Sequence, residues 1–346
     1  MTETAIRLLG GGLLALSGAL LGHEKKTVLL GQQRCLERLC RALGRMESEL
    51  CAVQTPMPQL LAKLEDCRFF GVTFTSFAQN SIAIFKGSGT TQPSAGLVVS
   101  NCNFYGCGVV MKGDVKYSTI YGYDVDLTVS GCKFIGCTQC ITELPVNVAA
   151  TSTVQNCTFE KGCCAPVHFG QKLSYKINEN SGFLVRDCQF IDNYSTWDAS
   201  AIRLDTTSPG YNVLIVVSNV VFKGNLSAEG ASAAVVGAPG NYSGTASWHR
   251  FYDCDFVGNR RLKSAPSAAV AACCTMYNSA RWFFKGCSFR DNTTAQETEN
   301  ADYPAASAVC SRGTSCYVYF HDCTFCGNSA SMAGPASVGT VVVDNS

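Results

Sequence analysis

The sequence predicts an all-β fold, a parallel β-helix of about nine stacked rungs that follows an N-terminal helical segment. The main observation is a nine-residue pattern, such as VSNCNFYGC at residues 99–107, which occurs nine times with steps of 25 to 36 residues. The second observation is a short strand of small residues that follows the pattern in the later copies. Periods of about 20 to 50 residues are typical of stacked units that share one continuous core.

The charge balance and the apolar content of the chain exclude some classes of protein. The chain has 346 residues, of which 47% are hydrophobic and 15% are charged, with 27 Lys+Arg against 26 Asp+Glu. Nucleic-acid-binding domains usually carry a marked excess of Lys and Arg. The balanced charge therefore argues against a nucleic-acid partner, and the apolar content is sufficient for a large core.

Phenylalanine stands at the centre of every copy and is predicted to form one buried stack. Residues two apart point to the same face of a strand, so the residue two positions before each Phe should also point inward. The Phe column comprises Phe69, Phe104, Phe134, Phe159, Phe190, Phe222, Phe256, Phe289 and Phe325. The inward column before it comprises Cys67, Cys102, Cys132, Cys157, Cys188, Val220, Cys254, Cys287 and Cys323.

Each copy is expected to bend just before this cysteine. An apolar column, which begins at Leu64 and continues at Val99, lies three positions before the cysteine, so a flat strand would place the two on opposite faces. The residues between them are all types that adopt positive φ or form Asx turns. They are Asp66, Asn101, Gly131, Asn156, Asp187, Asn219, Asp253, Gly286 and Asp322. This column predicts a corner in every rung.

Two further columns complete the predicted rung. Three positions past the Phe, the later copies carry Asn193, Asn225, Asn259, Asn292 and Asn328, where earlier copies have Cys107 and Cys137. Strands of small residues are predicted at 199–202, 231–235, 266–270, 306–309 and 336–338. In-register rungs about 4.8 Å apart would stack the equivalent side chains into ladders.

These columns resemble right-handed parallel β-helix proteins of the pectin-lyase-like class, and most closely the FxxN repeats of polymorphic outer-membrane proteins. The resemblance covers about residues 64–343 and implies a right-handed solenoid. It also implies one kind of activity known for the class, which is cleavage of acidic polysaccharides. The outer-membrane proteins carry GGA[ILV] in the partner strand where this chain has ASAV at 306–309.

The chain contains 21 cysteines, and the repeat explains many of them. Those in the inward column are expected to behave as small buried hydrophobic residues in a reduced ladder. The candidates for disulfides lie outside that column and are Cys163, Cys164, Cys273, Cys274, Cys310 and Cys316.

Residues 1–58 are predicted to form a separate N-terminal segment, and residues 59–346 the β-helix. Residues 8–22 are uncharged and apolar but shorter than the roughly 20 residues that span a bilayer. They predict either a signal or membrane contact, or a segment that packs against the body. An amphipathic stripe between residues 29 and 53 predicts either a homo-oligomeric coiled coil or a helix that covers the first rung. The stripe comprises Leu29, Leu36, Leu39, Leu43, Met46, Leu50 and Val53.

Motifs for chemistry are sparse. The sequence has no HExxH, no phosphate-binding glycine loop and no second CxxC at zinc-ribbon spacing, so we predict no metal site and no cofactor. The best acidic cluster, a weak candidate for catalysis, comprises Asp192, Asp198, Arg203 and Asp205. Two carboxylates about 5 to 10 Å apart would suit glycoside hydrolysis. Asp192, however, shares a turn column with Asp291.

Three functions are therefore compatible with the sequence. The first is a non-catalytic structural or adhesive β-helix on a cell surface or virion, which presents a binding face to a protein or glycan. The second is a polysaccharide lyase or glycoside hydrolase of the pectin-lyase-like class. The third is an intracellular scaffold subunit of a large assembly. A cell-surface, secreted or virion location is favoured over an intracellular one.

Overall fold

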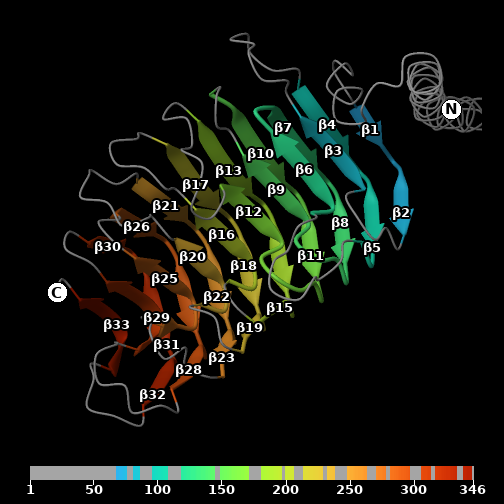
Figure 1. Cartoon of the computed structure of the whole chain (residues 1–346). Helices are drawn as coiled ribbons and strands as arrows, with labels where there is room; N and C mark the ends of the chain where they lie inside the picture. The colour runs from blue at the N-terminus through green and yellow to red at the C-terminus, as the bar shows by residue number, and fades with distance from the viewer. Residues whose placement is uncertain are drawn as a thin grey trace, which may run out of the picture.

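The structure is a computed structural model that describes residues 68–75, 81–85, 96–107, 118–144, 149–170, 181–196, 199–205, 213–228, 232–237, 248–262, 270–277, 281–296, 305–312, 316–332 and 338–344. Regular structure in these ranges consists of β-strands, numbered β1 to β33. The strands stack side by side along one axis, and the colour passes along that axis from blue to red (Figure 1). The molecule is a parallel β-helix, so the predicted fold class is confirmed.

Two parallel sheets hold nine strands each within the described ranges. Sheet A consists of β1 (Arg68–Phe70), β4 (Gly96–Ser100), β7 (Asp126–Ser130), β10 (Thr151–Gln155), β13 (Gly182–Arg186), β17 (Leu214–Ser218), β21 (Trp248–Tyr252), β26 (Arg281–Lys285) and β30 (Tyr317–His321). Sheet B consists of β2 (Thr73–Thr75), β5 (Asn103–Tyr105), β8 (Lys133–Ile135), β11 (Thr158–Glu160), β14 (Gln189–Ile191), β18 (Val221–Lys223), β22 (Asp255–Val257), β27 (Ser288–Arg290) and β31 (Thr324–Cys326).

Two further sheets complete the coil, and the strand count varies between them, from ten in sheet C to five in sheet D. Sheet C consists of β3 (Ile82–Phe85), β6 (Ile120–Tyr123), β9 (Ile141–Leu144), β12 (Val167–Gly170), β16 (Ile202–Asp205), β20 (Val235–Gly237), β24 (Val270–Ala271), β25 (Cys274–Tyr277), β29 (Ala305–Arg312) and β33 (Val338–Asp344). Sheet D consists of β15 (Tyr194–Ser195), β19 (Leu226–Ser227), β23 (Arg260–Arg261), β28 (Thr293–Gln296) and β32 (Ser329–Met332).

The predicted corner between sheets A and B is confirmed. Its residues from Asn101 to Asp322 all have positive φ, between 51° and 65°. Parallel pairing continues through the corner, because the Asn101 amide donates to the Ser130 carbonyl at 2.8 Å and the Lys133 amide to the Cys102 carbonyl at 3.0 Å. A second corner follows two residues after each Phe from Phe104 to Phe325 and again has positive φ, as at Gly106 and Asp192.

The prediction that Phe69 is the first member of the Phe column is wrong. Phe69 pairs with Val99 in sheet A, and it is Phe74 that pairs with Phe104 in the Phe column. Gly71, with φ of 66°, forms the corner between them, and its amide donates to the Ser100 carbonyl at 3.1 Å. The sequence FFGVTF offers a Phe at both places, and only the hydrogen-bonded register selects one. Leu64, Asp66 and Cys67 lie outside the described residues.

Two of the small-residue strands are also displaced from their predicted positions. In sheet C, Ile202 pairs with Val235, but the next partner is Cys274 rather than Val270. Val270 pairs instead with Ala305, in a short extra strand. The final strand is displaced by a register shift between Ala306 and Val309, which pairs Val341, and not Val338, with Val309. The added strand accounts for the higher strand count of sheet C.

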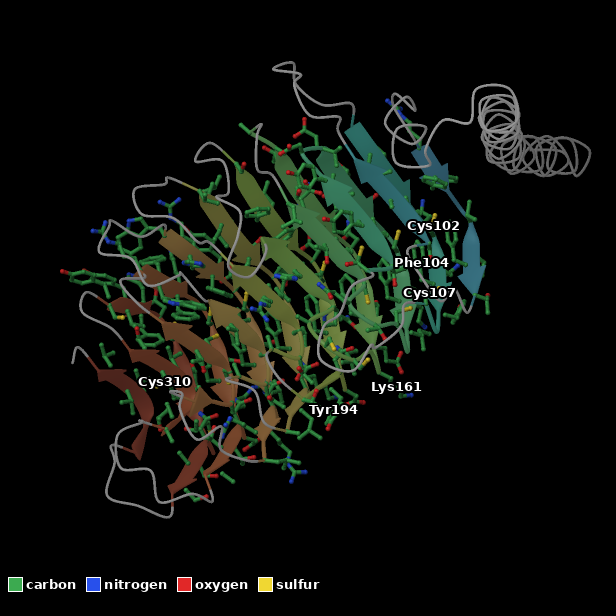
Figure 2. All side chains as sticks on the ribbon, viewed as in Figure 1. Cys102, Phe104, Cys107, Lys161, Tyr194 and Cys310 are labelled. Carbon is green, nitrogen blue, oxygen red and sulfur yellow. The ribbon has the colours of Figure 1, made fainter. Side chains whose placement is uncertain are left out.

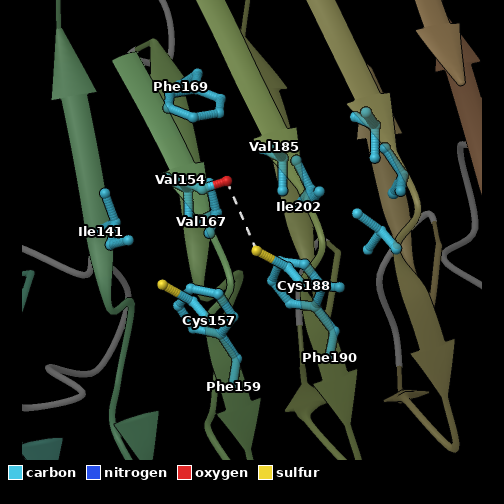
Figure 3. Close-up of a cluster of buried hydrophobic side chains, with 14 of the residues drawn as sticks. Ile141, Val154, Cys157, Phe159, Val167, Phe169, Val185, Cys188, Phe190 and Ile202 are labelled. Carbon is cyan, nitrogen blue, oxygen red and sulfur yellow. Dashed lines mark hydrogen bonds between the residues drawn. The ribbon is translucent and has the colours of Figure 1, made fainter. Parts of the chain in front are cut away.

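Ladders of equivalent residues fill the interior of the coil. Cys102, Phe104 and Cys107 follow one another along a single rung, and all three are buried (Figure 2). Two adjacent rungs superpose the triplets Val154, Cys157, Phe159 and Val185, Cys188, Phe190 (Figure 3). The Cys188 thiol donates to the Val154 carbonyl of the preceding rung at 3.6 Å (Figure 3). The core therefore runs as a continuous column through the described part of the chain.

The predictions for the N-terminal segment are untested. Residues 1–58, with the apolar run at 8–22 and the stripe at 29–53, lie outside the described residues. Within the described ranges, the structure has no helix long and apolar enough to cross a membrane.

Candidate functional site

The outer face of sheet A carries aromatic and cationic side chains near its C-terminal end. Strands β21, β26 and β30 alternate, so that residues such as Phe251 and Phe284 point into the core and the residues between them point outward. The outward side chains are Trp248, Arg250, Tyr252, Arg281, Phe283, Lys285, Tyr317, Tyr319 and His321. We call these nine residues the sheet A patch.

Strand register arranges the sheet A patch as a lattice. One row is Trp248, Arg281 and Tyr317, and the next is Arg250, Phe283 and Tyr319. Cationic and aromatic side chains therefore alternate in the first row, whereas the second row has one cation beside two aromatic rings. The Arg281 guanidinium lies 5.7 Å from the ring centres of both Trp248 and Tyr317. These are cation–π distances, and they hold the guanidinium between two rings.

The sheet A patch is positively charged and partly exposed. Three of its residues are Arg or Lys, and none is Asp or Glu. Tyr317 and Tyr319 are 47% and 49% exposed, which is a large fraction for aromatic rings. At the edge of the patch, His321 Nδ1 lies 2.8 Å from a carboxylate oxygen of Asp322. The patch thus offers ring faces and cations to a ligand on a flat surface of about 10 by 13 Å, given the usual strand spacings.

Such a surface is suited to recognition of an anion attached to an apolar or ring-shaped body. A guanidinium binds carboxylate or sulfate oxygens with two parallel hydrogen bonds and can stack on a ring at the same time. Trp, Tyr and Arg are also the side chains that contribute most to binding at protein surfaces. The lattice therefore has the composition of a binding face.

A second polar row lies on the outer face of sheet C. Tyr121, Thr142, His168 and Arg203 occupy equivalent positions on four successive strands. The Gln139 side-chain amide, Nε2, contacts both Thr142 Oγ1 at 2.9 Å and His168 Nδ1 at 2.8 Å. Because Thr142 is buried, this row is less open to solvent than the sheet A patch.

The structure places two members of the predicted acidic cluster on different parts of the coil. Asp192 forms the corner between sheets B and D, with φ of 51°, whereas Arg203 belongs to the polar row of sheet C. Asp205 ends β16, and its side chain lies outside the described residues, as does the whole of Asp198. Asp192 therefore has a structural role in the backbone turn.

One glutamate points into the core beneath the polar row. Glu143 is fully buried, and neither of its carboxylate oxygens has a hydrogen-bond partner among the described side chains. Gly122 of the preceding rung leaves the space that the carboxyl group occupies, since a Cβ there would overlap Glu143 Oε2. Burial raises the pKa of Glu143 well above its usual value, and the nearby carboxylates of Asp124 and Asp126 raise it further.

The Phe ladder is placed in one stack from Phe74 to Phe325. Successive ring centres are 4.6 to 5.3 Å apart and the rings are within 8° of parallel. The members between these ends are buried and are Phe104, Phe134, Phe159, Phe190, Phe222, Phe256 and Phe289. Phe325 is 37% exposed, because it belongs to the last rung that the structure describes in sheet B.

The Asn ladder satisfies its own polar groups. Asn225 Oδ1 accepts hydrogen bonds from the backbone amide and the side chain of Asn193, at 3.1 and 3.0 Å. Its Nδ2 donates to Asn259 Oδ1 and to the Phe190 carbonyl, both at 3.0 Å. The same arrangement repeats at Asn259 and Asn292 and reaches Asn328. Complete pairing explains how amides can lie in the core without a large desolvation cost.

The cysteines of the inward column carry thiols. Cys102, Cys132, Cys157, Cys188, Cys254 and Cys287 are buried, and Cys323 is partly exposed. Each Sγ from Cys132 onward contacts a carbonyl of the preceding rung, as in the 3.5 Å contact of Cys254 with Val217. The prediction of disulfides was wrong for Cys163, Cys164, Cys273, Cys274 and Cys316, which also carry thiols. Among the described residues, no group of three or more His, Cys, Asp or Glu could hold a metal ion.

Sequence reasoning missed the sheet A patch. Its residues occupy outward positions that follow no repeated column, and neighbours in one row are 33 or 36 residues apart in the chain. A usable signal was the local alternation in WHRFY, RWFFK and YVYFH, where every outward position is aromatic or basic.

Comparison with known proteins bears on the fold. A family model described as a right-handed β-helix region matches residues 62–259, which is more than half of the chain. No curated protein and no solved structure matches the chain. The match agrees with the stacked parallel sheets and with the predicted resemblance to pectin-lyase-like repeats. The chain therefore belongs to the right-handed β-helix family.

Proposed function

We propose that the protein is a non-catalytic structural or adhesive β-helix, displayed on a cell surface or virion, that binds an anionic glycan through the sheet A patch. The observation that supports this most directly is the alternation of rings and guanidinium in Trp248, Arg281 and Tyr317. The C–H faces of a sugar would pack on the rings, while a carboxylate or sulfate group would pair with the arginine.

The β-helix provides a rigid platform for such binding. Side chains on a stacked sheet lose little freedom when a ligand binds, because neighbouring rungs already restrict them. Arg281, held between two rings, is preorganised in this way. An extended ligand could contact several rungs at once, since equivalent positions recur along the axis.

The positions of the carboxylate side chains favour a function without catalysis. Glycoside hydrolysis requires two carboxyl groups fixed across one bond. The sheet A patch has none, and Asp192 is used in a corner. Binding without cleavage therefore accounts best for the side chains at the surface.

The test is direct binding of the full chain to immobilised glycans that are sialylated, uronate-containing, sulfated or uncharged. We expect selective binding of an acidic class, weakened about tenfold or more by Arg281→Ala, which corresponds to about 1.4 kcal/mol. Lys133→Ala, which removes an exposed charge from the outer face of sheet B, should bind as the wild type does. Equal binding by the wild type and Arg281→Ala, or no binding to any glycan, would refute the proposal.

A second candidate is an intracellular scaffold, and the thiols of the core favour it. Protein thiols persist in reducing compartments, whereas extracellular proteins more often contain disulfides. Full burial would, however, also protect thiols such as Cys254 outside the cell. Counting the thiols of the natively produced protein by mass spectrometry distinguishes the two, because extensive disulfide formation would exclude the scaffold.

A further inference from the structure

Four thiols gather at the second corner in two successive rungs. Cys137 and Cys140 form a CxxC sequence in one rung, and Cys163 and Cys164 are adjacent in the next. The rungs are joined by backbone hydrogen bonds, from the Cys163 amide to the Cys137 carbonyl at 3.1 Å and from the Gln139 amide to the Cys163 carbonyl at 3.2 Å. Figure 2 labels two residues near this corner, Lys161, which is two positions before Cys163, and Tyr194, which pairs with Cys163.

The thiols within each pair are in contact. A side-chain hydrogen bond joins Cys163 to Cys164, and another joins Cys137 to Cys140. Thr138 Oγ1 also lies 3.1 Å from Cys163 Sγ. The two pairs differ in access to solvent, because Cys137 and Cys140 are buried whereas Cys163 and Cys164 are only partly so. A small reagent in solution can therefore reach the second pair first.

The surroundings make Cys163 the nucleophile of its pair. The hydrogen bond from the Cys164 thiol lowers the pKa of Cys163, and the contact with Thr138 lowers it further, despite partial burial. The same hydrogen bond raises the pKa of Cys164. Burial raises the pKa of the deeper thiols Cys254 and Cys273 instead. The pKa values of Cys132, Cys137 and Cys287 are also lowered, but these three thiols are buried. The thiolate is the reactive form of cysteine, so reactivity among the accessible thiols should concentrate at Cys163.

We propose that Cys163 and Cys164 form a redox-active dithiol site that exchanges with low-molecular-weight disulfides of the glutathione type. The Cys163 thiolate attacks one sulfur of the small disulfide, whose S–S bond breaks as a mixed disulfide forms and one small thiolate leaves. Cys164 then loses its proton and attacks Cys163 Sγ, which forms the Cys163–Cys164 disulfide and releases the second small thiol. Two protein thiols are oxidised and one small disulfide is reduced to two thiols.

The local geometry favours a bond that can be reversed. Adjacent residues joined by a trans peptide have Cα atoms about 3.8 Å apart, below the roughly 4.4 to 6.8 Å that is usual in disulfides. A disulfide in this position is strained and hence easily reduced. Cys164 already has a φ of 62°, in the left-handed region that non-glycine residues seldom adopt. The site is thus suited to reversible oxidation rather than to a permanent crosslink, and this inference does not depend on the proposed glycan binding.

The experiment treats the folded, full-length protein with glutathione disulfide, quenches with acid, alkylates the remaining thiols and maps the peptides by mass spectrometry. We expect the wild type to form the Cys163–Cys164 disulfide without retained glutathione. Cys164→Ser should retain one glutathione on Cys163, because the resolving thiol is missing, and Cys163→Ser should react at neither position. Dithiothreitol should restore both thiols of the wild type.

Cys326, exposed on β31, is the internal control for accessibility alone. The proposal predicts that Cys163 reacts at least about tenfold faster than Cys326 in the same sample, because the lowered pKa of Cys163 keeps it largely as the reactive thiolate at neutral pH. It is overturned if Cys326 reacts as fast as Cys163, or if the wild type accumulates a stable glutathione adduct without the internal disulfide. A circular dichroism spectrum equal to that of the wild type establishes that a serine variant is folded. If a variant does not fold, the disulfide formation and the relative rates measured in the wild type test the proposal.

Discussion

Replacing Asn259 by Ala tests the hydrogen-bonded ladder within the core. Asn259 is fully buried, and its Oδ1 accepts from the Asn225 backbone amide at 3.1 Å and from Asn225 Nδ2 at 3.0 Å. Its own Nδ2 donates to the Phe222 carbonyl at 2.9 Å and to Asn292 Oδ1 at 3.0 Å. Asn259 also lies outside any glycosylation sequon, since Arg260 and Arg261 follow it, so a lost glycan cannot explain the result.

The magnitude follows from the groups that would lose a partner. In Asn259→Ala, the Asn225 backbone N–H and one Asn225 side-chain N–H have no acceptor, and the Phe222 carbonyl loses a donor. Asn292 Oδ1 still accepts the hydrogen bond from the backbone amide of residue 259, which is 3.0 Å long in the wild type. Each buried polar group left unpaired costs about 1 to 3 kcal/mol, so three such groups should lower the free energy of unfolding by about 3 to 9 kcal/mol.

Two measurements check this prediction. Urea unfolding followed by circular dichroism gives the loss of stability, and hydrogen exchange of the Asn225 amide gives its local origin, because neighbouring rungs of a solenoid can open separately. Asn103→Ala is a matched control on the outer face of β5 and should stay within about 0.5 kcal/mol of the wild type. A variant in which the Asn225 amide exchanges as slowly as in the wild type would refute the assigned role of the ladder.

Four further predictions follow from the structure and the sequence. Phe256→Ala removes a buried ring stacked at 4.6 and 4.8 Å on its neighbours and should cost about 3 to 5 kcal/mol, whereas Lys133→Ala, on an exposed surface, should cost less than about 0.5 kcal/mol in the same urea assay. Glu143→Gln should stabilise the protein increasingly, relative to the wild type, as the pH rises above about 4.5, because the raised pKa makes the folded wild type hold a proton that the unfolded chain releases. The same pH dependence of the free energy of unfolding in both proteins would contradict this. If the stripe at 29–53 forms a coiled coil, deleting residues 1–55 should convert an oligomer to a monomer in light scattering, and a full-length protein that is already monomeric would favour the covering helix instead. Polygalacturonate and alginate should not be cleaved in a reducing-sugar assay with or without calcium, and turnover that Asp205→Asn abolishes would support the enzyme.

The sequence by itself determined the repeating part of the fold. Inward positions are restricted by the rungs above and below, so Val, Cys, Phe and Asn recur at fixed places and can be recognised without coordinates. The corner can be recognised in the sequence as well, because Gly, Asn and Asp adopt the φ of 51° to 65° found there at the lowest cost, as at Asn101 and Gly286. These local requirements repeat in every rung and therefore leave a periodic pattern.

Register, by contrast, was decided by the tertiary structure. FFGVTF places a Phe at both 69 and 74, and either choice satisfies the apolar pattern. The hydrogen bond from the Gly71 amide to the Ser100 carbonyl selects the second. The displacement of Val270 has the same origin, because an added strand in sheet C shifts the pairing without any change in composition.

The candidate sites depend still more on the tertiary structure. Trp248, Arg281 and Tyr317 form one row only because parallel pairing places residues more than 30 positions apart on adjacent strands. Outward positions pack against no equivalent residue in the core, so they are free to vary and leave no column in the sequence. The thiol contact of Cys163 with Thr138 arises in the same way, from stacking of successive rungs. The buried columns thus specify the fold, while the surface and corner contacts that support function appear only once the coil is closed.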